Sequence, residues 1–320
     1  MKPTWLLILI LALITSGCAP ASQDFQLADN QILETGVDPD SWASIPAGFF
    51  PSGQSDHQFD LDYEYQIMVT DVTNQQYSDY LTQALASGDI QVGQVEVIEN
   101  ENSTTHYGVF GPYPGDPFDG SKHEDPIRAG NKLHYPLEGR GESIAFDGET
   151  FSTAPGLANH PLTMVSWFGA QAYCEYFGWH LPSELEWEKA ARGTELDSNG
   201  HGRAFPWGWE IERNQANYYS SFDLFEKIYG KLGSTTPVGF YNGRSYDGYQ
   251  TLDQASPYGL YDMAGNVWQW TGDVYPDQHY RYLRGGSFYS YEVDLRVWKR
   301  NSAGPTYFAP DVGFRCARSK

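Results

Sequence analysis

Residues 287–300 contain several side chains that could carry chemistry. The side chains of Ser287, Tyr289, Arg296 and Trp298 could together line a ligand pocket. A serine nucleophile needs an adjacent base, and no histidine lies in this stretch, so we expect Ser287 to cap a turn. The aromatic rings could line a pocket or support an oxidation, although such rings more often pack in a core or on a surface.

The same stretch contains no cysteine, and the whole chain has 3: Cys18, Cys174 and Cys316. Soft thiolates select Cu(I), whereas hydroxyl and alkyl groups do not, so a bis-thiolate copper site cannot form within residues 287–300. The 8 histidines are scattered and show no HExxH spacing. We therefore expect no copper.

The chain of 320 residues is acidic, with 20 Lys and Arg against 41 Asp and Glu and a net charge of −21. Phosphate binding needs a basic face, so nucleic acid is excluded as a partner. Clustered carboxylates leave room for a hard cation such as calcium. Hydrophobic residues make up 40% and aromatics 16%, which is enough to bury a sizeable core.

The N-terminus has the pattern of an export signal. Lys2 precedes an apolar run from Leu6 to Ile14, which is too short to span a bilayer. Gly17-Cys18 resembles a bacterial lipobox, although Thr15 departs from it. We predict a lipoprotein signal peptide at 1–17, a lipidated Cys18 and a tether at 18–44. This predicts a protein anchored in a bacterial cell-envelope membrane and facing the periplasm or the exterior; an ordinary signal peptide is the alternative.

The rest of the chain predicts a mixture of short helices and strands. A capping-box pattern at Thr73 and Gln76 begins one helix, and a second box at Ser183 and Glu186 begins another. Apolar spacing predicts a third helix at 166–177 and a strand at 65–69. Residues 89–158 are rich in turn signals, and we expect an elaborated surface excursion with short hairpins. The pattern is typical of an α+β fold.

Several motifs follow one another in a fixed order along the chain. They include Asn159-His160-Pro161-Leu162, Ala172-Tyr173-Cys174, Leu181-Pro182-Ser183-Glu184, Gly259-Leu260-Tyr261-Asp262-Met263, Arg284-Gly285-Gly286-Ser287 and Gly313-Phe314-Arg315-Cys316. Together they resemble the formylglycine-generating enzyme, or sulfatase-modifying factor, family over residues 45–318. The resemblance implies a divergent C-type-lectin-like fold with little regular secondary structure.

The resemblance also implies a disulfide. Family members join the cysteine of the AYC motif to that of the GFRC motif, and Cys174 and Cys316 occupy the matching positions. Two buried free thiols are the alternative. Export to an oxidising compartment favours the disulfide.

In family members that make formylglycine, two cysteines shortly after the RGGS motif hold copper and oxidise a cysteine of a client sulfatase. The matching stretch here has none, so the resemblance does not extend to that reaction. Relatives that use iron carry a histidine-rich helical domain, and nothing like it is present.

Calcium is the metal that the resemblance implies. Family members hold it in the turn that matches Asp262, the Gly265 and Val267 carbonyls, and Gln269. Gln269 stands where Glu is usual, which removes one negative charge and weakens the site. A second family site matches Asn217, the Tyr218 carbonyl and Asp223, with Asp247 as a rival for Asp223. A hydrogen-bonded turn without metal is the alternative.

Two functions are compatible with these observations. The first is a binding or scaffold module at the cell envelope, whose partner is an unidentified envelope protein or small ligand. The second is a periplasmic oxidoreductase without copper-thiolate chemistry that acts on a small aromatic or peptide substrate. Fold alone cannot choose between them, and a deep pocket at residues 287–298 would favour the enzyme.

Overall fold

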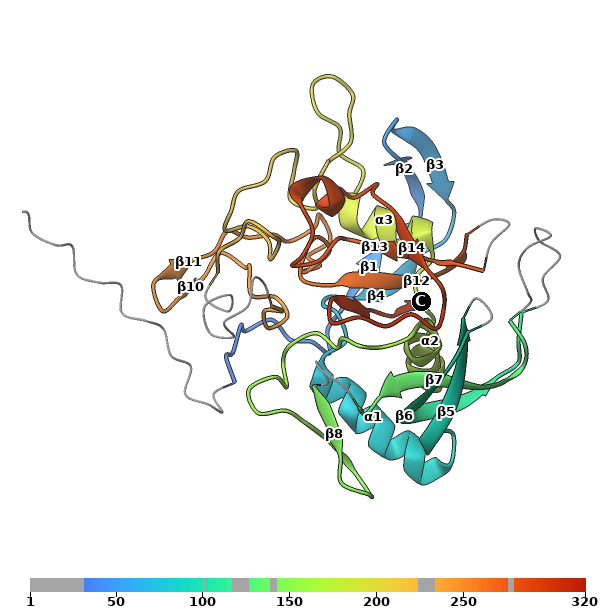
Figure 1. Ribbon diagram of the computed structural model, residues 1–320. Helices are drawn as coiled ribbons and strands as arrows, with labels where there is room; N and C mark the ends of the chain where they lie inside the picture. The colour runs from blue at the N-terminus through green and yellow to red at the C-terminus, as the bar shows by residue number, and fades with distance from the viewer. Residues whose placement is uncertain (1–31, 100–101, 117–126, 139–142, 224–233, 276–278) are drawn as a thin grey trace, which may run out of the picture.

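The computed structural model describes residues 32–99, 102–116, 127–138, 143–223, 234–275 and 279–320. Small sheets and short helices dominate, so the predicted α+β class is confirmed. The lower half of Figure 1 holds α1, α2 and the sheet β5–β7, and the upper half holds α3, β12, β13 and β14. The predicted signal peptide and Cys18 lie outside the described residues.

The three α-helices found among the described residues begin with side-chain caps that the sequence encodes. In α1 (Asn74–Ser87) the Thr73 hydroxyl accepts from the Gln76 amide while the Gln76 side chain accepts from the Thr73 amide. The same reciprocal pair joins Ser183 and Glu186 at the start of α3 (Glu184–Arg192). Both predicted capping boxes are therefore confirmed.

The helix α2 (Trp167–Tyr176) begins at Ser166, whose hydroxyl accepts from the Gly169 amide. Gly88 ends α1 in the left-handed conformation with φ 85°, which glycine adopts without a steric cost. Within the described ranges no helix has the length and apolar character needed to cross a membrane.

Two sheets form the frame beneath the C-terminal motifs. The first has the order β14-β13-β12-β15, in which β12 runs antiparallel to β13 and parallel to β15. The second, β1-β4-β16, joins the two ends of the domain. Their strands are β1 (Trp42–Ile45), β4 (Tyr65–Met68), β12 (Trp268–Val274), β13 (Arg281–Arg284), β14 (Asn301–Ala303), β15 (Val312–Phe314) and β16 (Ala317–Ser319).

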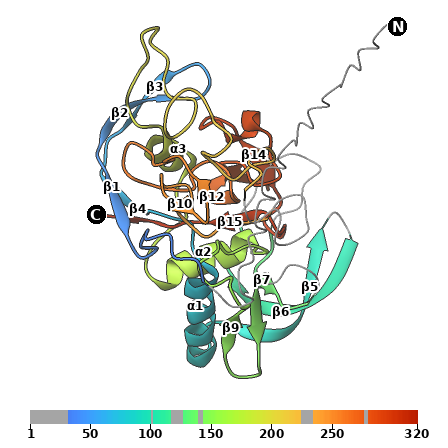
Figure 2. The same cartoon turned by 90° about the vertical axis from the view of Figure 1, so that its left-hand side faces the viewer.

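Residues 89–158 are more than the surface excursion that the sequence predicts. They form a three-stranded antiparallel sheet, β5-β6-β7, and a hairpin, β8-β9. Val109, Tyr135 and Ile144 are buried in the same core as α1 and α2, and both views place this region beside α1 (Figure 2). The strands are β5 (Gln91–Glu99), β6 (Asn102–Tyr113), β7 (Gly130–Pro136), β8 (Ile144–Phe146) and β9 (Phe151–Thr153).

The predicted tether at 18–44 is also too long. Thr35 is buried, and its hydroxyl donates to the Val238 carbonyl over 2.9 Å. Strand β1 begins at Trp42, inside the predicted tether. The error has a physical cause: this polar segment has no apolar periodicity, and its burial depends on the chain it packs against near Val238.

The described part of the chain also contains two short hairpins and one 3₁₀ helix. They are the hairpin of β2 (Gly48–Ser52) and β3 (His57–Leu61), the hairpin of β10 (Ser245–Tyr246) and β11 (Tyr249–Gln250), and a 3₁₀ helix, η1 (Glu292–Leu295).

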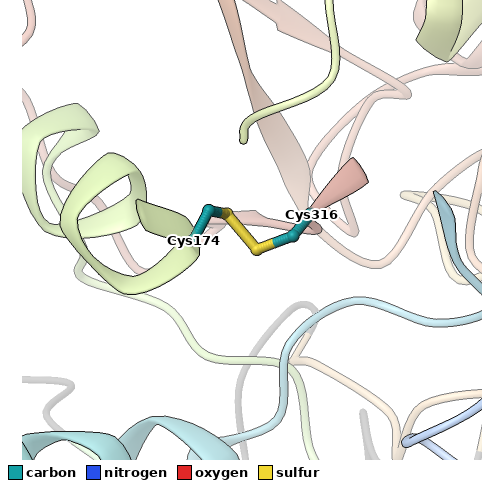
Figure 3. The surroundings of a disulfide bond; sticks show 2 residues. All are labelled: Cys174 and Cys316. Carbon is teal, nitrogen blue, oxygen red and sulfur yellow. A yellow bond between two sulfur atoms is a disulfide. The ribbon is translucent and has the colours of Figure 1, made fainter. Parts of the chain in front are cut away.

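A disulfide joins Cys174 in α2 to Cys316, which lies between β15 and β16 (Figure 3). The two cysteines are 142 residues apart in sequence, their Cα atoms are 5.7 Å apart, and both side chains are fully buried. This is the pair implied by the family resemblance. It fixes the C-terminal strands to α2, and it leaves neither cysteine as a thiolate.

Candidate functional site

An open pocket of about 410 Å³ lies where the loop after β13, η1 and the start of β14 meet the residue before β15. Its lining is mostly polar, with aromatic rings at several points. The lining residues are Trp268, Ser287, Tyr289, Ser290, Tyr291, Asp294, Lys299, Arg300, Asn301 and Asp311.

A hydrogen-bonded trio of polar side chains lies in this pocket. The Ser287 hydroxyl donates to the Asp311 carboxylate over 2.8 Å, and the Ser287 and Ser290 hydroxyl oxygens are 3.3 Å apart. Burial raises the pKa of Asp311, and the hydrogen bond from Ser287 opposes that rise. No histidine is among the lining residues. The Ser287 hydroxyl also accepts from the Tyr289 amide, which is the turn-capping contact expected for it.

Two exposed tyrosines, Tyr289 and Tyr291, line the pocket, and a third, Tyr219, lies against Tyr291. Tyr289 is 48% exposed, Tyr291 60% and Tyr219 45%. The rings of Tyr219 and Tyr291 are in contact, with centroids 4.9 Å apart. The Tyr219 amide donates to the Ser290 carbonyl over 3.0 Å, which holds the two segments together. Residues 72 positions apart, by 291 − 219, thus form one aromatic surface.

The charged side chains of the pocket already have partners. The Lys299 ammonium lies 3.5 Å from the Asp294 carboxylate, and the Arg300 guanidinium pairs with Glu184 at 2.5 Å. Glu184 also pairs with the fully buried Arg284 at 2.9 Å. Among the described residues, therefore, the pocket presents no unpaired cation to a ligand.

The structure brings together only half of the predicted pocket residues. Ser287 and Tyr289 line the pocket, but Arg296 and Trp298 do not. Trp298 packs on a separate core with Val297, and its ring lies beneath the guanidinium groups of Arg192 and Arg296, at 5.2 Å and 5.8 Å. Asp294 and Lys299 of the same stretch line the pocket, whereas Val297 and Trp298 between them pack in the core that contains Trp187.

The sequence interpretation missed Asp311, which lies 24 residues beyond Ser287. The parallel pairing of β12 with β15 places it in the pocket, since the Trp268 amide donates to the Asp311 carbonyl over 2.8 Å. Asp311 stands directly before the Val312-Gly313-Phe314 strand, and an acidic residue at a strand entrance was the available signal. No feature of the sequence predicted the contact between the rings of Tyr219 and Tyr291.

Beside the pocket, the turn from Asp262 to Gln269 is fully buried and closed by hydrogen bonds. The two carboxylate oxygens of Asp262 accept from the Gly239 amide at 2.6 Å and from the Gln254 side-chain amide at 2.8 Å. The Asp262 carbonyl accepts from the Gln269 side-chain amide at 2.6 Å. Burial raises the pKa of Asp262, and these donors oppose the rise.

The oxygen of Gln269 is also occupied. It accepts from the indole of Trp187 at 2.7 Å and from the guanidinium of Arg315 at 2.8 Å. Gly265 adopts φ 84° and approaches the backbone of Asn217 closely, while Val267 is buried. Ca²⁺ needs six to eight oxygens. In this arrangement the oxygens of Asp262 and Gln269 serve protein donors, so this set does not fit calcium.

The second predicted calcium set contains one unsatisfied atom. The Asn217 side-chain nitrogen donates to the Ser234 carbonyl at 2.7 Å, while its buried oxygen has no hydrogen-bond partner among the described residues. Tyr218, the residue after Asn217, is buried. Asp223 is also buried, and it accepts from the Tyr241 hydroxyl at 2.8 Å. The rival Asp247 has φ 45°, at a turn between β10 and β11. The orphaned amide oxygen is the feature that fits a cation here.

Within the described part of the chain, no group of three or more His, Cys, Asp or Glu side chains is placed to hold a metal ion.

The sequence of this domain is similar to those of several known proteins. The profile of the Sulfatase-modifying factor enzyme 1-like domain matches residues 30–320. Serine/threonine-protein kinase Pkn1 of Chlamydia trachomatis is 37% identical over 182 residues, which cover 51% of this chain and 25% of the kinase. The Inactive C-alpha-formylglycine-generating enzyme 2 of Bos taurus is 36% identical over 165 residues, 49% of this chain and 50% of that protein.

The Formylglycine-generating enzyme of Mus musculus is 28% identical over 309 residues, which cover 85% of this chain and 73% of that enzyme. The chain thus spans about a quarter of the length of the kinase and half that of the inactive enzyme.

Two solved structures share the fold. PvdO from Pseudomonas aeruginosa has a TM-score of 0.51 at 18% identity, covering 92% of this chain and 100% of PvdO. CarF has a TM-score of 0.52 at 19% identity, covering 87% of this chain and 98% of CarF. At these identities the likeness concerns the fold alone. It agrees with the predicted divergent C-type-lectin-like architecture.

Proposed function

The chain belongs to the sulfatase-modifying factor enzyme 1-like family, and from this premise we propose that it is a lipid-anchored binding module of the bacterial cell envelope that does not make formylglycine. The domain keeps the family frame over residues 30–320. Its pocket presents hydroxyl, carboxylate and phenol groups in place of thiols.

One observation carries this proposal. The residues that line the pocket include no cysteine, and both cysteines of the described chain are joined in a buried disulfide. Copper-dependent thiol oxidation needs soft thiolate ligands, and serine hydroxyls do not replace them. The chemistry of the donor set therefore does not fit copper.

The names of the relatives indicate that similar domains occur in proteins with different functions. One similar protein carries the word "inactive" in its name, and another is named a protein kinase. Similarity to this domain therefore does not by itself imply formylglycine formation. The open tyrosine-lined pocket supports ligand or partner binding, since loops on a rigid frame commonly present such surfaces.

The first test is a combined copper and turnover assay on the full-length chain in detergent. Cu(I) binding would be followed by competition with a chromogenic chelator, and a cysteine-containing sulfatase-type peptide would be followed by mass spectrometry under oxygen. We expect no tight copper binding and no loss of the peptide thiol. Copper-dependent conversion of the peptide would overturn the proposal.

Lipid anchoring rests on Cys18 and needs its own test. Metabolic labelling with an alkyne fatty acid should mark the wild-type chain and leave Cys18→Ser unmarked, because acylation requires the thiol. Equal labelling of both chains, or none of either, would show that Gly17-Cys18 is not a lipidation signal here.

A periplasmic oxidoreductase is the second candidate function. The observation in its favour is that Trp268, Tyr289 and Tyr291 line a pocket large enough for a small aromatic or peptide substrate. Oxygen consumption with a tyrosine-containing peptide, compared between wild type and Tyr289→Phe, tests it. Consumption that requires the Tyr289 phenol would favour the enzyme over the binding module.

A further inference from the structure

The tyrosines around the pocket form a surface that a ligand ring could cover. Tyr219 and Tyr291 contact each other and are both about half exposed or more, and Tyr289 is exposed on the same loop as Tyr291. Single exposed aromatics are ordinary, but three beside one pocket are a shared feature of the site. A tyrosine offers a flat apolar face at low conformational cost and keeps its hydroxyl in water.

The charge of the pocket restricts the ligand. Each cation that lines it is paired, Lys299 with Asp294 and Arg300 with Glu184, and Asp311 adds a further carboxylate. The whole chain carries −21. A phosphate or carboxylate would therefore have to compete with an existing ion pair, against the charge of the whole protein. An anionic ligand is therefore disfavoured.

The remaining lining groups favour a ligand with many hydroxyls. Ser287, Ser290 and Asp311 are held in one hydrogen-bonded trio, and Asn301 adds an amide that can both donate and accept. The volume of about 410 Å³ lies at the lower end of the range of small-molecule pockets. A plain aromatic ring could not use the remaining hydrogen-bonding capacity of these groups, whereas a ligand with several hydroxyls could.

On the basis of the proposed binding function, we infer that this pocket binds a neutral sugar ring of a glycan, with one apolar ring face stacked on the Tyr219–Tyr291 pair and its hydroxyls bonded to the Asp311 side of the pocket. A pyranose combines the three properties that the lining requires. It carries no anionic group, it presents an apolar C–H face, and it carries donors and acceptors around its edge.

The test is calorimetric titration of the full-length chain with neutral hexasaccharides of glucose, mannose and N-acetylglucosamine. The chain would be held in a sugar-free polyoxyethylene detergent, and polygalacturonate would serve as the charged comparison. We expect at least one neutral hexasaccharide to bind. Tyr291→Ala should weaken that binding about tenfold through loss of the stacking face.

Two variants isolate the stacking contribution. Tyr291→Phe keeps the ring and should stay within about twofold of wild type, because stacking needs the face and not the hydroxyl. Tyr107→Ala removes another exposed tyrosine, 40% accessible and away from the pocket on β6, and should leave affinity unchanged. Equal weakening by Tyr291→Ala and Tyr107→Ala would contradict a site at the pocket.

The outcomes separate this inference from the proposed function. Absence of binding by every neutral hexasaccharide, or binding of polygalacturonate alone, would overturn the sugar assignment. If the copper and peptide assay is also negative, the binding-module proposal survives that result. Binding of tyrosinamide in place of sugar, with the same dependence on Tyr291, would overturn the ligand class and keep the pocket.

Discussion

The turn from Asp262 to Gln269 and the loop from Ser287 to Arg300 are neighbours, since Gln269 in β12 pairs with Arg284 in β13. The turn is buried, and its side chains bond to the backbone and to Gln254. The loop holds a polar pocket and places Tyr289 and Tyr291 in solvent. Both regions come from strong family motifs, yet one is closed and the other is open.

The difference shows what the family motifs encode. Residues of the closed turn bond to distant elements, as Gln269 does to Trp187 and Arg315. The residue types in this turn therefore hold the surrounding helix and strands in place. The open loop rests on that frame and is free to change its chemistry, because loops carry function on a rigid scaffold. Substitutions in the frame should therefore cost stability, and substitutions in the loop should cost binding.

The largest effect should come from the disulfide that ties the frame together. Replacing both Cys174 and Cys316 by Ala should lower the free energy of unfolding by roughly 5 kcal/mol, because the bridge closes a loop of 142 residues in the unfolded chain. Urea unfolding under oxidising conditions measures the loss. The wild-type chain in reductant is the matched control, and equal stability of all three samples would contradict a structural role.

The next effect concerns the centre of the closed turn. Gln269→Ala leaves the Trp187 indole, the Arg315 guanidinium and the Asp262 carbonyl without their common partner, and should cost about 3 kcal/mol. Ser290→Ala in the open loop is the comparison and should cost about 1 kcal/mol or less. Similar losses in urea unfolding would remove the distinction between the two regions.

The free energy of unfolding should also depend on pH, because of the buried carboxyl group of Asp71. Burial raises the pKa of Asp71 to about 8, opposed by its ion pair with Arg315 and reinforced by Asp262. The unfolded chain releases this proton near pH ~3.9. Between these values the folded state holds more protons, so this contribution to stability falls as pH rises, by at most about 1.4 kcal/mol per unit.

Urea unfolding across this range, compared between wild type and Asp71→Asn, isolates the contribution of Asp71. The wild-type free energy of unfolding should fall more steeply with rising pH than that of the variant. Parallel curves would show that Asp71 titrates alike in the folded and unfolded chains.

A smaller effect should appear when the closed turn is changed toward the family pattern. Gln269→Glu removes the amide that donates to the Asp262 carbonyl, which frees that oxygen for a cation, and it supplies a negative charge. Calcium at several times its dissociation constant should then stabilise the variant by about 1 kcal/mol more than the wild type. Melting temperatures with calcium and with chelator measure this, and an equal shift would place calcium elsewhere, as at Asn217.

The smallest effect on stability is expected in the open loop. Tyr291→Ala removes a ring that is 60% exposed and should change the free energy of unfolding by less than about 0.5 kcal/mol. The same variant should show the largest loss in ligand binding. A loss of several kcal/mol in stability would mean that the Tyr219–Tyr291 contact belongs to the frame.

Local features followed from the sequence because their causes are local. The capping boxes at Thr73 and Ser183 join residues three positions apart, so the residue types alone predict both helix starts. The ordered motifs identified the family and implied the pairing of Cys174 with Cys316. The absence of cysteine from residues 287–300 likewise needed no structure to exclude the copper site.

Only the tertiary structure decided which residues share the pocket. Asp311 reaches Ser287 through the parallel pairing of β12 with β15, and Tyr219 reaches Tyr291 across 72 positions, by 291 − 219. Trp298, close to Tyr291 in sequence, turns to the core instead. Short-range hydrogen bonds are fixed by neighbouring residue types, whereas contacts between distant segments depend on how the whole frame packs, and no local pattern records that.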